Sequence, residues 1–221
     1  MYEEVAEYLN ITEPEAQQMF RDIYPKVPQE WERRRSTNSF YRNTPYYLFD
    51  LMNWEKGGKK EFTKEILSYC KSRDVKVALD YGCGIGTDAI AMAEAGVKVY
   101  LADIPSKHFY FALWRMYKRG LPVEGIISIT EDCPPLPNTD LVVCIAVLEH
   151  LENPEPNLIN MIYSTKALAI KADPTIEGNP MHFEKNFPFL RELDGLYPPL
   201  LARLGIRRDN YTDPTIFKVV G

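Results

Sequence analysis

The chain has 221 residues, of which 45% are hydrophobic and 26% are charged, and its formal net charge is -5. This globular composition suits one α/β domain with an added segment, and the length is short for two independent domains. The negative charge argues against general nucleic-acid binding, which usually requires a basic excess or a basic face.

Cysteine and histidine usage argues against a zinc site and against a secreted protein. The four cysteines form no Cys-x-x-Cys pair and there are three histidines, so no metal is expected. Cys83 and Cys144 fall in segments predicted to be buried, which suits reduced thiols in the cytoplasm. The acidic N-terminus is unlike a signal peptide, and no apolar run approaches the ~20 residues of a membrane helix. The expected location is therefore cytoplasmic, without a membrane partner.

Residues 1–73 are predicted to form a helical cap, or lid, ahead of the main domain. Thr12 and Glu15 make a capping-box pattern that begins one helix of this region. Pro25 and Pro28 are expected to break that helix, because proline lacks the backbone N–H group. Further helices are expected near Trp31 and over residues 61–71.

From residue 74 onward, short apolar runs alternate with amphipathic segments. Strands that alternate with helices indicate a parallel sheet with helices on both faces. Residues 74–221 are therefore expected to form a doubly wound, Rossmann-like α/β domain of about seven strands, mostly parallel with the last one antiparallel. The expected strands are 75–79, 97–102, 125–130, 140–146, 167–171, 209–211 and 215–220. The expected helices are 87–95, 106–119, 155–164 and 183–204, the last with a kink at Pro198-Pro199.

A glycine-rich loop follows the first of these strands. Asp80 ends the strand, and Gly82, Gly84 and Gly86 follow it in a GxGxG spacing. Glycines let the backbone approach a ligand closely, and a helix N-terminus at this edge of a parallel sheet is a natural ligand seat. A carboxylate at Asp80 would repel a pyrophosphate but attract the ammonium group of an amino acid. Asp103 ends the next strand, where a carboxylate can accept both hydroxyls of a ribose.

These motifs resemble those of the class I S-adenosylmethionine-dependent methyltransferases. The similarity covers about residues 75–172, and its most typical segments are 77–86, 132–137 and 147–151. The resemblance implies S-adenosylmethionine as the cofactor and methyl transfer by in-line displacement as the activity. It does not identify the acceptor.

The resemblance also implies which residues hold the cofactor, from its methionine end to its adenine. The implied contacts are Asp80 and Ala146 at the methionine end, Gly82, Gly84 and Gly86 along the methionine and ribose, Asp103 at the ribose hydroxyls, Ile104 on the adenine ring, and Asp132, with Glu131 as its near rival, at the adenine amino group.

The acceptor end can be predicted only as a set of candidates. The protein mainly has to align the acceptor with the methyl group and exclude water, with a base added for an oxygen or nitrogen acceptor. His150, with Glu149 beside it, can position the acceptor or remove its proton, or both residues can brace the loop. His182 is an alternative base. Tyr41 is the aromatic of the cap expected to face the cleft, because it is expected to lie just before a helix rather than inside the apolar face of that helix. His108 is interpreted as a surface residue.

Three functions remain open from the sequence. The first is methyl transfer to oxygen, nitrogen or carbon of a small molecule, which the acidic charge favours. The second is methylation of a protein or RNA, which a basic face around Arg33, Arg34, Arg35 and Arg42 beside the cleft would favour. The third is a non-catalytic adenosylmethionine-binding partner subunit. The sequence is compatible with a homodimer.

Overall fold

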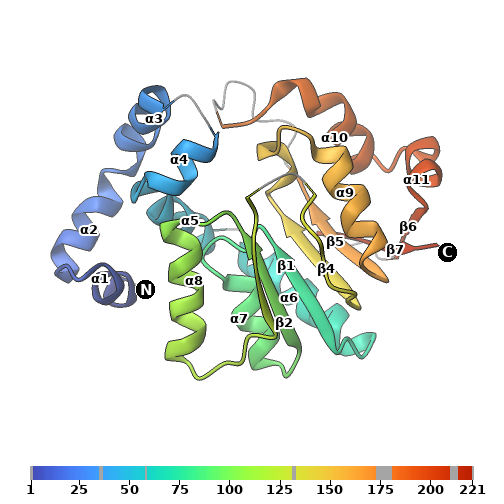
Figure 1. Cartoon of the computed structure of the whole chain (residues 1–221), viewed down its shortest axis with the longest axis horizontal. Helices are drawn as coiled ribbons and strands as arrows, with labels where there is room; N and C mark the ends of the chain where they lie inside the picture. Colours follow the sequence, from blue (N-terminus) through green and yellow to red (C-terminus); the bar gives the residue numbers. More distant parts are fainter. Residues whose placement is uncertain are drawn as a thin grey trace.

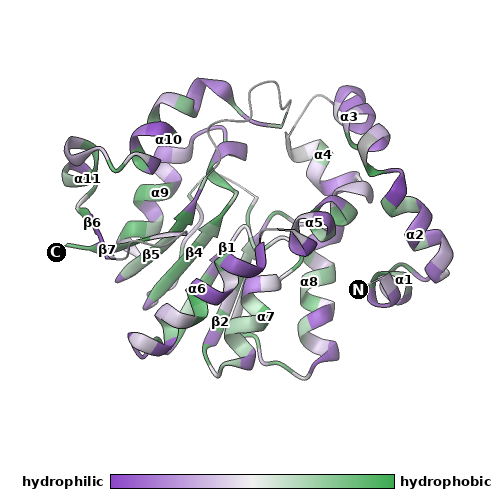
Figure 2. Cartoon of the chain, turned by 180° about the vertical axis from the view of Figure 1, so that it is seen from behind, coloured by the Kyte–Doolittle hydropathy of each residue, from purple (hydrophilic) through white to green (hydrophobic). Residues whose placement is uncertain are grey.

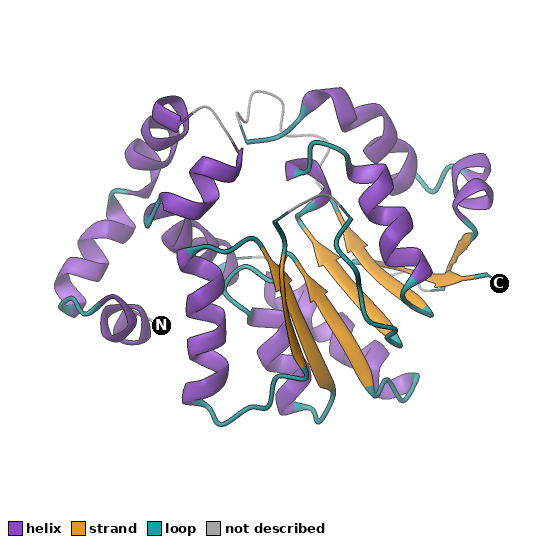
Figure 3. Cartoon of the chain, viewed as in Figure 1, coloured by secondary structure: helices purple, strands orange, loops and turns teal. Residues whose placement is uncertain are grey.

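The computed structural model of the chain describes residues 2–34, 37–57, 59–130, 133–172, 181–209 and 214–220. Over these residues a central sheet is flanked by helices, with the N-terminal helices gathered at one side (Figures 1 and 3). The strands are β1 (Val77–Tyr81), β2 (Lys98–Asp103), β3 (Gly125–Ser128), β4 (Leu141–Ile145), β5 (Ala167–Lys171), β6 (Ile206–Arg208) and β7 (Thr215–Val219). The helices are α1 (Tyr2–Leu9), α2 (Glu13–Arg21), α3 (Ile23–Arg34), α4 (Thr37–Asn43), α5 (Tyr46–Lys56), α6 (Lys59–Ser72), α7 (Thr87–Glu94), α8 (Lys107–Lys118), α9 (Pro154–Tyr163), α10 (Phe187–Asp194) and α11 (Pro198–Leu204), with 3-10 turns η1 (Leu148–His150) and η2 (Glu184–Asn186).

The sheet has the strand order β3-β2-β1-β4-β5-β7-β6. The pairs among β1 to β5 are parallel, whereas β7 runs antiparallel to both of its neighbours. The predicted doubly wound, mostly parallel sheet is therefore confirmed. The order of the strands reverses between β1 and β4, and this switch point is where such sheets bind their ligands.

Each central strand contributes alternate side chains to two apolar layers. Ala78 and Val143 pack with α6, α7 and α8 on one face, and Leu79 and Val142 pack with α9, α10 and α11 on the other. Because both faces are covered, β4 is buried along its whole length and appears hydrophobic throughout (Figure 2). None of the helices in the described part of the chain is both long and apolar enough to cross a membrane.

The N-terminal helices are fixed to the sheet domain through α8. Glu4 of α1 makes ion pairs with Arg115 and Arg119, at 3.8 and 2.5 Å, and the Tyr8 hydroxyl donates to the carbonyl of Lys107 at 3.2 Å. Their apolar side chains form a third cluster, which also includes Ile85 of the glycine-rich loop. The N-terminal helices are thus packed directly against the loop.

The capping box at Thr12 is confirmed, since Thr12 and Glu15 exchange both hydrogen bonds at the start of α2. The predicted break at Pro25 and Pro28 was wrong. Helix α3 contains both prolines, Pro25 in its first turn, where no N–H is needed, and Pro28 further along.

The C-terminal part also differs from its prediction. The single helix expected over 183–204 is the turn η2 followed by two helices, α10 and α11. Gly195 caps α10 and Leu196 has a φ of +56°, so the chain turns before Pro198 begins α11. The strand expected over 209–211 is not found at Asp209, which follows the end of β6 at Arg208, and residues 210 and 211 lie outside the described residues.

Candidate active site

A cavity of about 720 Å³ lies at the carboxyl ends of the parallel strands, at the switch point. Its walls combine the strand ends with the cap and with the segment that precedes η2. The lining residues are Tyr41, Tyr47, Asp50, Leu51, Asn53, Trp54, Lys59, Phe62, Tyr81, Gly82, Cys83, Gly84, Ile85, Thr87, Asp103, Ile104, His108, Ile129, Thr130, Ile145, Ala146, Val147, Glu149, His150, Leu151, Glu152, Lys171, Met181, His182 and Phe183.

The glycine-rich loop forms one wall of this cavity. Gly82 and Gly84 have φ values of +71° and +58°, a region that favours glycine. A Cβ at Gly82 would lie 2.4 Å from Cγ2 of Val147, so the loop approaches the end of β4 more closely than any other residue would allow. The N–H groups of Gly82 and Cys83 both donate to the carbonyl of Ala102, which ties the loop to β2.

Gly86 and Asp80 support the loop from behind. Gly86 is not among the lining residues; a Cβ there would lie 3.0 Å from that of Ala112, so this glycine permits the close packing of α7 on α8. Asp80 is buried, and its carboxylate accepts from the N–H of Ala89 at 3.0 Å, in the first turn of α7. The negative charge of Asp80 therefore stabilises the helix N-terminus that follows the loop.

Asp103 links the end of β2 to the glycine-rich loop. Its two carboxylate oxygens accept from the N–H groups of Gly84 and Ile104, both at 2.7 Å. Nε2 of His108 lies 3.4 Å from the same carboxylate. His108 is only 2% exposed, so its interpretation as a surface residue was wrong. Asp103 and Ile104 both line the cavity, so a carboxylate held rigidly by backbone donors faces the ligand space.

A buried lysine enters the cavity from the start of α6. The ammonium group of Lys59 lies 2.9 Å from a carboxylate oxygen of Asp88 and 4.6 Å from the ring centre of Trp54. Burial alone would lower the pKa of Lys59, but the carboxylates of Asp88 and Asp80 raise it, so the lysine is charged. Burial, with the neighbouring Asp88, raises the pKa of Asp80. This end of the cavity is thus a compact group of interacting charges.

The carboxyl end of β4 has an unusual backbone conformation. Ala146 has a φ of +54° and its N–H donates to the carbonyl of Lys171 at 2.7 Å. Non-glycine residues with positive φ are uncommon and are concentrated at ligand sites. Ala146 lines the cavity next to Val147, as expected for a residue that presents backbone to a ligand. The adenine contacts expected at Glu131 and Asp132 lie outside the described residues.

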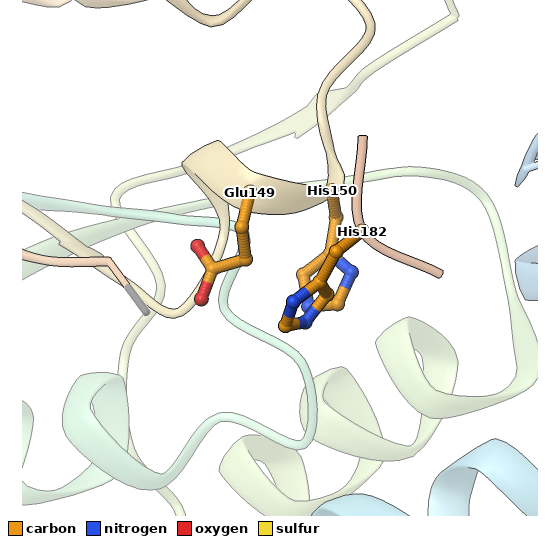
Figure 4. A group of neighbouring side chains, drawn as sticks. All are labelled: Glu149, His150 and His182. Atoms are coloured by element: carbon orange, nitrogen blue, oxygen red, sulfur yellow. The ribbon is translucent and has the colours of Figure 1, made fainter. Parts of the chain in front are cut away.

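Glu149, His150 and His182 come together at the other end of the cavity (Figure 4). One potential ligand atom from each lies within 4.8 Å of the others, and the two imidazole centres are 4.7 Å apart. The segment that carries His182 is joined to η1 because the N–H of Phe183 donates to the carbonyl of Glu149 at 3.0 Å. Two segments that are distant in the sequence therefore form one cluster of polar side chains.

The orientation of His150 is fixed by the cap and by Met181. Nδ1 of His150 lies 3.1 Å from the Met181 carbonyl and 2.9 Å from the Tyr41 hydroxyl. Since a carbonyl only accepts, the contact with Met181 requires the hydrogen on Nδ1 and leaves the lone pair on Nε2. Burial lowers the pKa of His150 to about 4, so the imidazole is neutral at physiological pH. Tyr41 lines the cavity, although it lies within α4 rather than before a helix.

Comparison with known proteins identifies the family. A model described as a methyltransferase domain matches residues 42–175. The chain belongs to the methyltransferase-domain family. This membership and the sheet topology confirm the resemblance to class I methyltransferases.

The methyltransferase domain also aligns with curated relatives. Ubiquinone biosynthesis O-methyltransferase from Rickettsia canadensis is 29% identical over 98 residues, 44% of this chain and 42% of that protein. The protein of the same name from Azoarcus sp. is 34% identical over 82 residues, 36% of this chain and 35% of the relative. The aligned part thus spans less than half the length of these relatives.

Solved structures share the fold over a larger part of this chain than the curated relatives do. Magnesium protoporphyrin IX methyltransferase from Synechocystis PCC 6803 with bound SAM has a TM-score of 0.55 and 17% identity, covering 89% of this chain and 92% of that one. The same enzyme with bound SAH has a TM-score of 0.53 and 19% identity, covering 74% and 83%. At identities of 17% and 19%, this similarity shows a shared fold.

Two groups of the cavity, Lys59 and Asp50, were missed from the sequence. Both reach the cavity from the cap, beside Tyr47, and burial raises the pKa of both Asp50 and Tyr47. Lys59 follows closely after Gly57, the glycine that ends α5. This position is visible in the sequence, but it does not indicate that the side chain of Lys59 points into a cavity. Their placement depends on how the cap packs.

Proposed function

We propose that this chain binds S-adenosylmethionine and transfers its methyl group to an oxygen of a small-molecule acceptor. One observation carries the proposal: a single cavity is lined both by Asp103 and the glycine-rich loop and by the cluster of Glu149, His150 and His182. Its volume of about 720 Å³ is within the range of about 300–1,000 Å³ typical of ligand pockets. The name of the relatives, O-methyltransferases, supports oxygen as the acceptor atom.

The cofactor would lie along the loop, with its ribose hydroxyls on Asp103 and its adenine ring on Ile104. Gly82 and Gly84 leave room for the methionine part, and Ala146 offers backbone beside it. Lys59 is positioned to attract the carboxylate of the cofactor, because it is a charged group in the wall next to the loop. Asp80 would act from behind the loop, on the ammonium group.

The adenine amino group is proposed to donate to Asp132, or to Glu131 beside it. This part of the proposal comes from the family resemblance. Ile129 and Thr130, which precede them in the sequence, line the cavity.

Methyl transfer would proceed by in-line displacement. The bond between sulfur and the methyl carbon breaks as the bond to the acceptor oxygen forms, and the electron pair stays on sulfur, so neutral S-adenosylhomocysteine leaves. The acceptor hydroxyl must also lose its proton. Glu149, His150 and His182 are the groups at that end which can take up the proton or neutralise the charge of the oxygen. Tyr41 would hold His150 in position through its hydroxyl.

Residues 1–73 are proposed to act as the cap that closes the cavity and excludes water. Tyr41, Tyr47 and Trp54 supply an aromatic wall suited to a sulfonium cation. A small acceptor is favoured over a protein or RNA, since Arg33 and Arg34 both pair with Glu30 at 2.9 Å; Arg35 lies outside the described residues. A cytoplasmic location is supported by the buried free thiols at Cys70, Cys83 and Cys144. The homodimer stays a prediction.

Calorimetry with S-adenosylmethionine, S-adenosylhomocysteine and NAD tests the cofactor. We expect both sulfur nucleosides to bind and NAD not to bind; binding of NAD alone would refute the proposal. Incubation with S-adenosylmethionine and a panel of phenols, amines and carbon acids then tests the acceptor, with the methylated product detected by mass spectrometry. Products from amines or carbon acids but from none of the phenols would refute an oxygen acceptor.

A further inference from the structure

The acceptor end of the cavity holds more ionisable side chains than the removal of a single proton requires. Glu149 supplies a carboxylate and His150 and His182 supply two imidazoles, with their ligand atoms within 4.8 Å of one another. Figure 4 shows the three side chains directed from η1 and from the following segment into the same region. The sequence argument against zinc considered ligands that are neighbours in the sequence, whereas these come from two separate segments.

We propose that Glu149, His150 and His182 bind a divalent transition cation of the zinc class, which holds the acceptor oxygen beside the methyl group. Two imidazoles and one carboxylate form a three-ligand set typical of catalytic zinc sites, which keep a further position for water or substrate. Mg²⁺ prefers oxygen ligands alone and suits this set less well.

The geometry is close to what such an ion requires. Zinc ligands lie about 2.0–2.2 Å from the ion, so two of them in a tetrahedral site are about 3.4 Å apart. The ligand atoms of these residues lie within 4.8 Å of one another, so they would have to close by at most about 1.4 Å around an ion. Glu149 is 1% exposed, so an ion at this position would be largely screened from bulk water.

The surroundings of His150 support its role as a ligand. Its Nδ1 atom lies 3.1 Å from the carbonyl of Met181, which leaves Nε2 to face an ion. A histidine that binds a metal almost always donates its other ring N–H to a carbonyl or carboxylate, which fixes the ring. The backbone bond from Phe183 to Glu149 further holds the two ligand segments together. The three side chains are thus of types that bind zinc, and the fold also holds them together.

This role in catalysis rests on the proposed methyl transfer. The acceptor hydroxyl would bind at the remaining position of the ion, its O–H bond would break, and the proton would pass to solvent. The resulting oxygen anion, stabilised by the ion, would then attack the methyl group of the cofactor. No oxidation or reduction is involved, and His150 and His182 would act as ligands rather than as bases.

The test measures metal binding separately from activity. The full chain is treated with a chelator, loaded with S-adenosylhomocysteine and titrated with Zn²⁺ and with Mg²⁺ in a calorimeter. We expect one Zn²⁺ per chain and a much weaker response to Mg²⁺. Loss of an outer-sphere partner costs about 10–100-fold in metal affinity, so loss of a ligand in His182→Ala or Glu149→Gln should cost at least ~100-fold.

The matched control is Glu94→Gln, which changes an exposed carboxylate that does not line the cavity and should leave Zn²⁺ affinity unchanged. Titration of the wild-type chain with Co²⁺ gives a second measurement that needs no variant, since bound Co²⁺ should show visible absorption typical of nitrogen and oxygen ligands. Absence of Zn²⁺ and Co²⁺ binding by the wild-type chain, or equal affinity in His182→Ala, would overturn the metal site.

The catalytic role has its own readout. Chelator treatment should abolish methyl transfer and Zn²⁺ should restore it; full turnover after chelation would overturn that role. If S-adenosylhomocysteine binds while Zn²⁺ does not, the metal site alone has failed. If neither cofactor nor product binds, the proposed methyltransferase function has failed.

Discussion

The two ends of the cavity are built in different ways. At the cofactor end, Gly82, Gly84 and Asp103 belong to two adjacent strand ends, and hydrogen bonds to the backbone hold them. At the acceptor end, Tyr41 and His182 come from segments far from η1 in the sequence, and side-chain contacts bring them together. The first end depends on the sheet, and the second depends on how the cap and the segment after β5 pack on it.

This difference implies that substitutions at the two ends should change different measurable properties. Changes at the cofactor end should affect cofactor affinity or folding, because backbone and sheet are shared. Changes at the acceptor end should affect turnover and leave cofactor affinity unaltered. Single substitutions should therefore separate the two ends.

The largest effect is expected for Asp103→Ala. The variant loses a carboxylate that would accept both ribose hydroxyls and that also holds the loop through Gly84. Each hydrogen bond to a charged group contributes about 1.5–3 kcal/mol, so affinity for S-adenosylhomocysteine should fall at least ~100-fold. Calorimetry measures the change, and Glu124→Ala, an exposed carboxylate that pairs with Lys98, serves as the control. Unaltered affinity would show that the ribose lies elsewhere.

The next effect is expected for Gly82→Ala, measured as the free energy of unfolding. The new Cβ would lie 2.4 Å from Val147, and the residue would also be strained at its φ of +71°. Strain of about 1–2 kcal/mol and overpacking of about 1–3 kcal/mol together predict a loss of about 3 kcal/mol. Gly96→Ala is the matched control, because Gly96 has a φ of +85° and no atom within 4 Å of a Cβ.

The comparison of these two glycines separates strain from contact. Gly96→Ala should lose only the strain part, and Val147→Ala should restore part of the stability of Gly82→Ala. Equal losses in both glycine variants would mean that the approach of the loop to β4 is unimportant.

The same contrast explains how much could be predicted from the sequence. The glycine spacing and Asp103 are local features that follow from how a strand ends and a helix begins, so they could be placed before the structure was known. Strand β5 was predicted with its bounds, since a buried parallel strand has a continuous apolar run. His108 was misplaced because a histidine in an amphipathic helix gives no sign of the carboxylate that it will face.

The acceptor end was predicted as separate candidates and not as a cluster. Glu149 and His150 are neighbours in the sequence, but His182 reaches them through tertiary contacts, which include its ring contact with His150 and the backbone bond between Phe183 and Glu149. Tyr41 was expected to face the cleft for a local reason, its place before a helix, whereas it lies within α4 and contacts His150 across the cavity wall. Such contacts depend on tertiary packing, which has no local pattern in the sequence.

A smaller effect is expected for Tyr41→Phe. The variant keeps the buried ring and loses the hydroxyl that lies 2.9 Å from Nδ1 of His150. A net hydrogen bond contributes about 0.5–1.5 kcal/mol, so kcat should fall about 10-fold or less while cofactor affinity stays the same. Tyr46→Phe, on a neighbouring tyrosine that does not line the cavity, should have no effect. A fall in cofactor affinity with unaltered kcat would show that Tyr41 supports cofactor binding, and it would contradict the proposal that the two ends act separately.

The smallest effect concerns the proton of Asp80. Burial and the nearby Asp88 raise the pKa of Asp80 to about 7, so part of the ligand-free chain carries a proton there at neutral pH. The ammonium group of the cofactor would stabilise the carboxylate and lower this pKa, so cofactor binding at pH 6.5 to 7 should release a fraction of a proton. Calorimetry in buffers with different ionisation enthalpies measures the release. It should vanish in Asp80→Asn, which keeps an acceptor for the N–H of Ala89, and in the wild-type chain well above pH 7, where the carboxylate is already ionised. Proton uptake instead of release would place the ammonium group away from Asp80, and the methionine end of the cofactor would then have to be held by Lys59 and the loop alone.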